Sequence, residues 1–171
     1  MAAGRRTGQS GFSAIELIVV VAVILIIAAI AVPRMLHARM KANEAAAMAS
    51  VRTVETAQSV YANMFPQTGY SNSLLNLGSN GSNCETITRT NACLIDSTLA
   101  SGLKGSYLFD VTGDGMVPVQ SYTVTATPQT SSAGECMFSG DQSGAISSSV
   151  AGSGGSFRSA SSVPGGSSGG C

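Results

Sequence analysis

Apolar residues are concentrated near the start of the chain, in an almost unbroken run that begins at Phe12 and stops before Pro33. The only charged residue in this run is Glu16. About 20 apolar residues in a helix cross the hydrocarbon core of a bilayer, and in lipid a helix satisfies its own backbone hydrogen bonds. The pattern therefore predicts a membrane-spanning helix over residues 12–33. Proline removes a helical hydrogen bond, so a helix break is expected at Pro33.

The helical pattern continues after Pro33 with a different character. Residues 34–65 contain neither Gly nor Pro, and apolar side chains recur there at three- and four-residue steps. The apolar stripe consists of Ala47, Val51, Val54, Ala57, Tyr61 and Phe65. Charged residues such as Arg52 and Glu55 fall off this stripe. Residues 34–66 are thus predicted to form an amphipathic helix that packs on a second element and ends at Pro66.

A polar segment and then a sheet are expected after this helix. Residues 67–105 are rich in Gly, Ser, Thr and Asn, which predicts a loop with short helical turns near Ser73–Leu77 and Leu94–Ala100. From Ser106 the period changes to two, as in half-buried strands. The expected strands cover residues 106–111, 120–127, 135–139 and 145–148. One face of this antiparallel sheet, over residues 106–148, is apolar and needs the amphipathic helix as a cover. The predicted fold class is α+β.

The end of the chain and its cysteines belong together. Residues 149–171 are mostly Gly and Ser, which predicts a tail that does not fold alone. All four cysteines follow the apolar run, and an even number on the exported side of a membrane indicates disulfides. Three connectivities are open. We favour Cys84–Cys93, whose short loop would contribute roughly 2.5–3 kcal/mol, together with Cys136–Cys171, which would tether the tail.

Composition weighs against several classes of function. The formal net charge is zero and charged residues make up 11% of the chain, so a nucleic-acid-binding surface is not expected. His37 is the only histidine, and neither a catalytic triad, a paired-carboxylate cleft nor a phosphate-binding loop can be assembled. We therefore expect no enzyme activity, no cofactor and no metal site. Calcium binding at Asp110, Asp114 or Asp141 is left open, although Asp beside Gly is typical of turns.

The charges around the apolar run bear on its orientation and purpose. Arg5 and Arg6 precede it and would hold the N-terminus in the cytoplasm. An ionised side chain at the bilayer centre costs roughly 3 kcal/mol, so Glu16 needs a partner. Arg34 lies 18 residues further on, about 27 Å along a helix. The simplest alternative is a plain N-terminal membrane anchor with a basic flank.

The N-terminal pattern resembles the signature of type IV pilins and type II secretion pseudopilins. The resemblance is carried by the basic leader of residues 1–11, the Gly11-Phe12 junction, Glu16, the apolar run and Pro33. Ser13 and Ala14 stand where Thr and Leu are usual in the family. The likeness implies a type IV pilin-like fold, in which the long helix packs on a small antiparallel sheet.

The resemblance also implies how the chain is processed and assembled. A prepilin peptidase would cleave between Gly11 and Phe12 and N-methylate Phe12. The new amine would pair with Glu16 of a neighbouring subunit in a helical homo-oligomeric filament. The precursor would sit in the inner membrane with its assembly machinery, and the filament would be exposed at the cell surface. The alternatives are a pseudopilin of a type II secretion system and a minor pilin acting in adhesion or DNA uptake; the cysteines and the tail favour a surface pilus.

Overall fold

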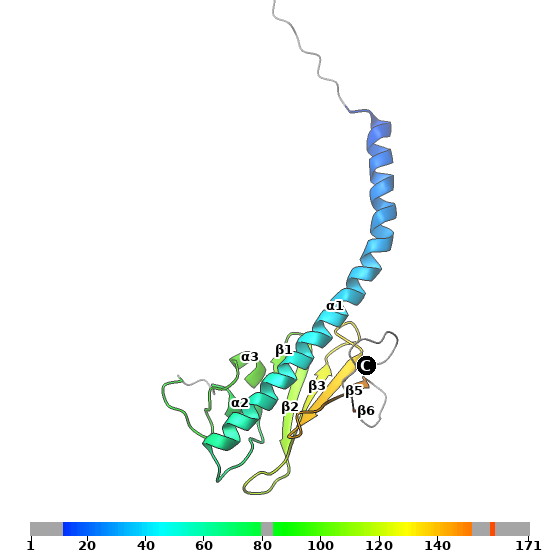
Figure 1. The fold of residues 1–171 in the computed structure, drawn as a ribbon. Helices are drawn as coiled ribbons and strands as arrows, with labels where there is room; N and C mark the ends of the chain where they lie inside the picture. The colour runs from blue at the N-terminus through cyan, green and yellow to red at the C-terminus, as the bar shows by residue number, and fades with distance from the viewer. Residues whose placement is uncertain (1–11, 80–83, 152–157, 160–171) are drawn as a thin grey trace, which may run out of the picture. The chain divides into compact units, whose positions relative to one another are not determined.

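The computed structural model describes residues 12–79, 84–151 and 158–159 of the chain (Figure 1). The helices are α1 (Ala14–Met64), α2 (Leu74–Leu77) and α3 (Ser97–Ala100). The strands are β1 (Leu103–Lys104), β2 (Tyr107–Gly113), β3 (Tyr122–Pro128), β4 (Cys136–Asp141), β5 (Ile146–Val150) and β6 (Arg158–Ser159). The chain divides into two units between Ala38 and Arg39. In its described residues, the first unit is the apolar part of α1.

Helix α1 runs without interruption through Pro33. The helix break expected at this residue is therefore not present in the structure. The proline ring fixes φ near the helical value, and the missing N–H removes a single hydrogen bond. The neighbouring turns keep their own bonds, and no Gly or second Pro lies nearby to end the helix.

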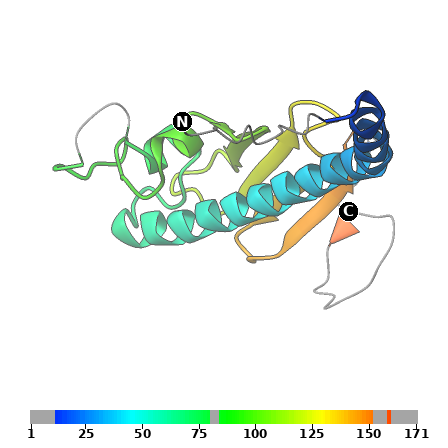
Figure 2. The same ribbon diagram turned by 90° about the horizontal axis from the view of Figure 1, so that it is seen from above.

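The strands form one antiparallel sheet in which each strand pairs with the next in sequence, from β1 to β6. The second half of α1 lies across one face of this sheet, as both views show (Figures 1 and 2). The sheet side chains that face α1 include Tyr107, Phe109 and Val111 on β2, which are all buried. The expected α+β class, with a long helix on an antiparallel sheet, is confirmed.

The predicted apolar stripe of α1 forms the helix side of the core. Ala47, Val51, Val54, Ala57 and Tyr61 are buried, and Phe65 packs at the edge of the core. The alternation in β3 also holds, because Tyr122, Val124 and Ala126 are buried while Thr123 is exposed. Periodicity succeeded here because burial in these elements follows the geometry of one packed face.

Two short strands were not predicted. Strand β1 pairs with β2 at Leu103↔Leu108, and β6 pairs with β5 at Ser147↔Ser159, inside the segment expected to be an unfolded tail. Both are two residues long, too short for a period to show. Their pairing uses backbone groups, so Gly- and Ser-rich composition does not prevent it. Strands β2 to β5 also end one or two residues later than expected, because pairs such as Gly113↔Tyr122 continue the ladder.

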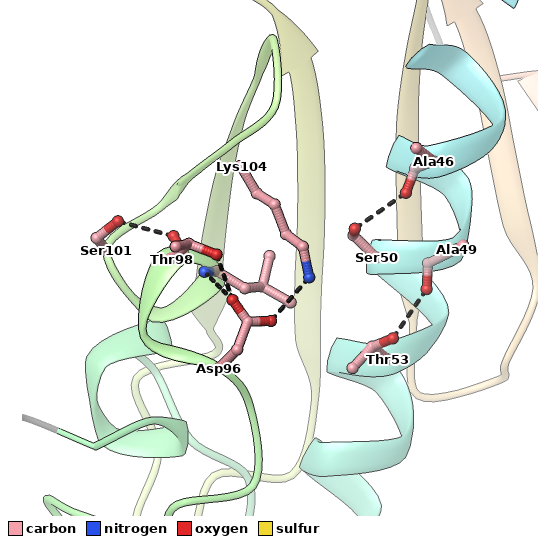
Figure 3. A network of polar contacts seen from close by, with 9 residues as sticks. Ala46, Ala49, Ser50, Thr53, Asp96, Thr98, Ser101 and Lys104 are labelled. Carbon is pink, nitrogen blue, oxygen red and sulfur yellow. Dashed lines mark hydrogen bonds and ion pairs between the residues drawn. The ribbon is translucent and has the colours of Figure 1, made fainter. Parts of the chain in front are cut away.

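The polar segment between α1 and the sheet is held by specific hydrogen bonds. Asp96 caps α3 by accepting from the backbone N–H of Leu99 at 3.0 Å, and it also accepts from Thr98 and from Nζ of Lys104, the latter at 2.7 Å (Figure 3). These donors, Lys104 first, hold the pKa of Asp96 far below its usual value. The same view shows Ser50 and Thr53 of α1 donating to the carbonyls of Ala46 and Ala49. The predicted short helices near residues 73–77 and 94–100 are both present, as α2 and α3.

One acidic residue of α1 is placed against the sheet, although it lies off the apolar stripe. A Cβ atom added at Gly140 of β4 would lie 2.2 Å from Oε1 of Glu55. That oxygen is buried and has no hydrogen-bond partner in the described part of the chain. Burial, with a smaller contribution from Asp141, raises the pKa of Glu55 above its usual 4.5 despite the nearby Arg52.

We expect Glu55→Gln to stabilise the fold at neutral pH. A raised pKa in the folded state means that the stability associated with Glu55 is fully present below the unfolded pKa and is lost as the pH rises through the folded pKa. The variant lacks this loss, so its advantage over the wild type grows from about pH 4 to about pH 7.5. Urea unfolding of the full chain in detergent at the two pH values measures it, with Glu85→Gln on an exposed loop as the control. An advantage independent of pH would contradict the assignment.

Candidate membrane and assembly site

The first half of α1 presents apolar side chains on every side. From Ile15 to Leu36 its large hydrophobic residues are between 46% and 70% exposed. This segment is long and apolar enough to cross a membrane, with a mean hydropathy of 3.3 in its most apolar window. A helix that is hydrophobic all round is stable only where lipid or other protein surrounds it. The segment therefore requires an apolar environment that the described residues of the chain do not supply.

Glu16 lies in the first turn of α1, which begins at Ala14. The carbonyl of Ser13 accepts the first helical hydrogen bond, from the N–H of Leu17 at 3.3 Å. A carboxylate in the first turn interacts favourably with the helix dipole, but this is worth less than the cost of burying the charge in lipid. Glu16 is exposed, and no described residue forms a hydrogen bond or an ion pair with it.

Phe12 precedes the helix and is 86% exposed. It lies four positions before Glu16, so its backbone nitrogen is at the same end of α1 as that carboxylate. Gly11, with which Phe12 forms the expected cleavage site, lies outside the described residues. The structure thus places the two residues of the expected ion pair at one helix end.

A polar cluster that the sequence did not reveal fixes α1 to the sheet in the second unit. Oε1 of Glu44 accepts from the backbone N–H of Glu135 at 2.9 Å, and Oε2 accepts from Nζ of Lys41 at 2.8 Å. Asn43 donates to the carbonyl of Ala133 at 3.1 Å. Burial alone would raise the pKa of Glu44, but the hydrogen bonds from Lys41 and from the backbone of Glu135 lower it below its usual value. The spacing of three residues between Lys41 and Glu44 was visible in the sequence. The contact of Glu44 with the β3–β4 loop was not.

The hydroxyl of Tyr107, which lies near this cluster, joins two strands of the sheet. It donates to the carbonyl of Cys136 at 2.9 Å. Burial, together with the neighbouring Glu44, raises the pKa of this tyrosine to about 12, so the hydroxyl keeps its proton throughout the physiological range. A buried donor of this kind fixes the start of β2 to the start of β4.

The cysteines were expected to pair in sequence order. The structure contains the Cys84–Cys93 disulfide, which closes the loop after α2. Cys136 is buried at the start of β4 and is not a free thiol. Its expected partner, Cys171, lies outside the described residues. The Cys84–Cys93 loop is thus covalently fixed beside the α2 segment.

Of the three aspartates considered for calcium, Asp110 is an exposed residue of β2, whereas Asp114 and Asp141 lie at the turns after β2 and β4. Asp114 accepts hydrogen bonds from the backbone N–H groups of Met116, Gln120 and Ser121, at 2.9 to 3.0 Å. Asp141 accepts from the backbone N–H of Ser143 at 2.7 Å. These are the contacts of aspartates that stabilise turns. Within the described residues, no group of three His, Cys, Asp or Glu side chains is arranged to hold a metal ion.

The fold and this site together define an α+β protein with one N-terminal helix able to cross a membrane. Comparisons with protein-family models, with curated proteins and with solved structures give no match to this chain.

Proposed function

We propose that the chain is the structural subunit of a type IV pilus-like filament. The observation that carries the proposal is the first half of α1, which is apolar all round, exposed, and bears a single carboxylate at its first turn. A plain membrane anchor would gain stability from Ile or Leu at that position. In an assembly interface, in contrast, the carboxylate can pair with a cation on the neighbouring subunit, and only a correctly placed neighbour provides that cation.

Leader removal would create the missing partner of this carboxylate. Cleavage between Gly11 and Phe12 by a prepilin peptidase converts the amide nitrogen of Phe12 into an amine, which keeps its positive charge after N-methylation. Before cleavage, that nitrogen is part of a peptide bond and carries no charge. The ion pair between this amine and Glu16 of a neighbouring subunit therefore forms only after processing.

Repetition of this contact would build the filament. The amine and the carboxylate are different parts of the same surface, so the contact is head-to-tail rather than self-complementary. Contacts of this kind generate open helical assemblies when the rotation does not close. The apolar halves of α1 would form the filament core, replacing lipid with neighbouring helices, and the sheet unit would be displayed on the outside.

The proposal assigns two locations to the chain. The precursor would be a single-pass protein of the inner membrane, with Arg5 and Arg6 in the cytoplasm. The filament subunit would be extracellular. The Cys84–Cys93 disulfide supports the exported location of the second unit, because disulfides persist in oxidising compartments.

Fractionation of cells that produce the chain tests this function. We expect the processed chain in filaments sheared from the cell surface, visible by electron microscopy, and in the inner membrane as a reserve. Recovery from the envelope alone would favour a pseudopilin of a type II secretion system. Recovery of an unprocessed chain from the membrane alone would favour a plain anchor.

A further inference from the structure

A pocket of about 260 Å³, lined by both apolar and polar residues, lies in the second unit, where the end of α1, the segment after it and the β2–β3 loop meet. Its volume is slightly below the usual range of ligand pockets, roughly 300–1,000 Å³, and suits a single sugar ring. The lining side chains that matter for binding are Gln67, Tyr70, Asn72, Asn76 and Arg89. They come from two separate segments, residues 67–76 and the loop at Arg89, so only the folded unit brings them together.

Backbone hydrogen bonds fix two of the segments that line this pocket. The N–H of Tyr70 donates to the carbonyl of Val119 at 3.0 Å, and the N–H of Val119 donates to the carbonyl of Thr68 at 2.8 Å. Gly69 has a φ of +76°, and a Cβ there would meet the oxygen of Val119 at 2.1 Å. The backbone segments at Gly69 and Val119 can approach this closely only because residue 69 is glycine.

The buried side-chain amide of Gln58 fixes the backbone of the lining segment at Ser71. Gln58 of α1 donates to the carbonyl of Ser71 at 2.8 Å and accepts from its N–H at 2.7 Å. The ring of Tyr70 packs on Tyr122, with centroids 4.8 Å apart. The pocket is therefore preorganised, which reduces the entropy lost when a ligand binds.

Several other polar side chains that line the pocket form no polar contacts that stabilise the described part of the fold. In the described part of the chain, the side-chain amides of Gln67, Asn72 and Asn76 form no hydrogen bond, and the guanidinium of Arg89 forms no ion pair. The hydroxyl of Tyr61 donates to the carbonyl of Arg89 at 2.8 Å, which fixes the backbone that presents this arginine. Among the described residues that line the pocket, Arg89 is the only cationic one.

We propose that this pocket binds a sugar residue that carries a carboxylate, such as a uronic acid within a glycan. Amide side chains offer both donors and acceptors to sugar hydroxyls, and an aromatic ring packs against the apolar face of a sugar. A guanidinium pairs with a carboxylate through two parallel hydrogen bonds. A single arginine matches a single negative charge, whereas a phosphate dianion would call for further cations. The site goes beyond the proposed filament function and does not depend on it.

Titration of the full-length protein in detergent micelles with D-glucuronate and D-glucose tests the site. The two sugars differ at C6, where glucuronate has a carboxylate and glucose a hydroxymethyl group. Ligand-observed NMR is expected to show saturable binding of glucuronate, about tenfold tighter than glucose. The Arg89→Gln variant should lose this preference. Arg52→Gln, which removes an exposed arginine of α1 outside the pocket, should keep it.

A second variant makes the test independent of any effect of Arg89 on folding. Asn72→Asp places a negative charge in the lining of the pocket at an exposed position and should weaken glucuronate more than glucose. An unchanged unfolding midpoint in both variants shows that the fold is retained. The proposal is overturned if neither sugar binds saturably, if both variants keep the wild-type preference, or if inorganic phosphate binds more tightly than glucuronate.

Discussion

Replacing Glu16 with Val is expected to reduce the yield of filaments about tenfold or more, while membrane insertion and leader removal proceed normally. Valine is more favourable than a carboxylate in lipid, so the precursor should insert at least as well. The amine of Phe12 would still form, but its partner on the neighbouring subunit would be missing. An uncompensated charge in a low-dielectric interface is strongly penalised, and the penalty is repeated in every subunit. Quantification of the chain in sheared and membrane fractions measures the effect.

A matched control separates the charge from the packing of the helix. Ile18→Val changes an exposed apolar residue of the same segment without altering any charge, and it should assemble normally. Glu16→Asp keeps the charge on a shorter side chain and should retain part of the yield. Wild-type filament yield from Glu16→Val would refute the proposed ion pair.

Replacing Gly11 with Asp is expected to block processing altogether. The proposed cleavage site requires a small residue before the scissile bond, and a charged side chain there would not fit. The chain would then retain residues 1–11, and the nitrogen of Phe12 would remain in a peptide bond. Without the amine, Glu16 has no partner, so assembly should fail as well. Mass measurement of the membrane fraction distinguishes the precursor from the processed chain.

The two variants should fail at different steps. The Gly11 variant should accumulate with its leader, whereas the Glu16 variant should accumulate without it. Gly8→Asp introduces the same charge inside the leader and should be processed normally, which controls for charge alone. Processing of Gly11→Asp at the wild-type rate would contradict the assigned cleavage site.

Periodicity predicted the helix and most of the sheet because their apolar faces are regular. The stripe from Ala47 to Tyr61 is buried as expected, and so are the alternate apolar residues of β2 and β3. Periodicity does not identify polar residues whose partners come from distant segments. Glu44 is buried because the backbone of Glu135 and the ammonium of Lys41 satisfy its carboxylate. Gln58 is buried because the backbone of Ser71 satisfies its side-chain amide. Glu55 is held against Gly140, where a glycine leaves room for it.

The candidate sites differ in how far the sequence reveals them. Phe12 and Glu16 are close in the chain, so their pattern is visible without a structure. The pocket proposed to bind a sugar combines Asn72, Arg89 and the loop at Met116, which are brought together by the fold. The sequence predicted that the helical pattern continues beyond Pro33 but not that the helix is unbroken there, because proline is compatible both with a break and with a continuous helix that lacks one hydrogen bond.

The mass and sequence of the N-terminal peptide from sheared surface filaments test the central claim most directly. The proposal predicts that the peptide begins at Phe12 and that this residue carries one additional methyl group on its nitrogen. A surface filament whose subunits retain Gly11 and the preceding leader, or whose N-terminus lies beyond Glu16, would contradict it.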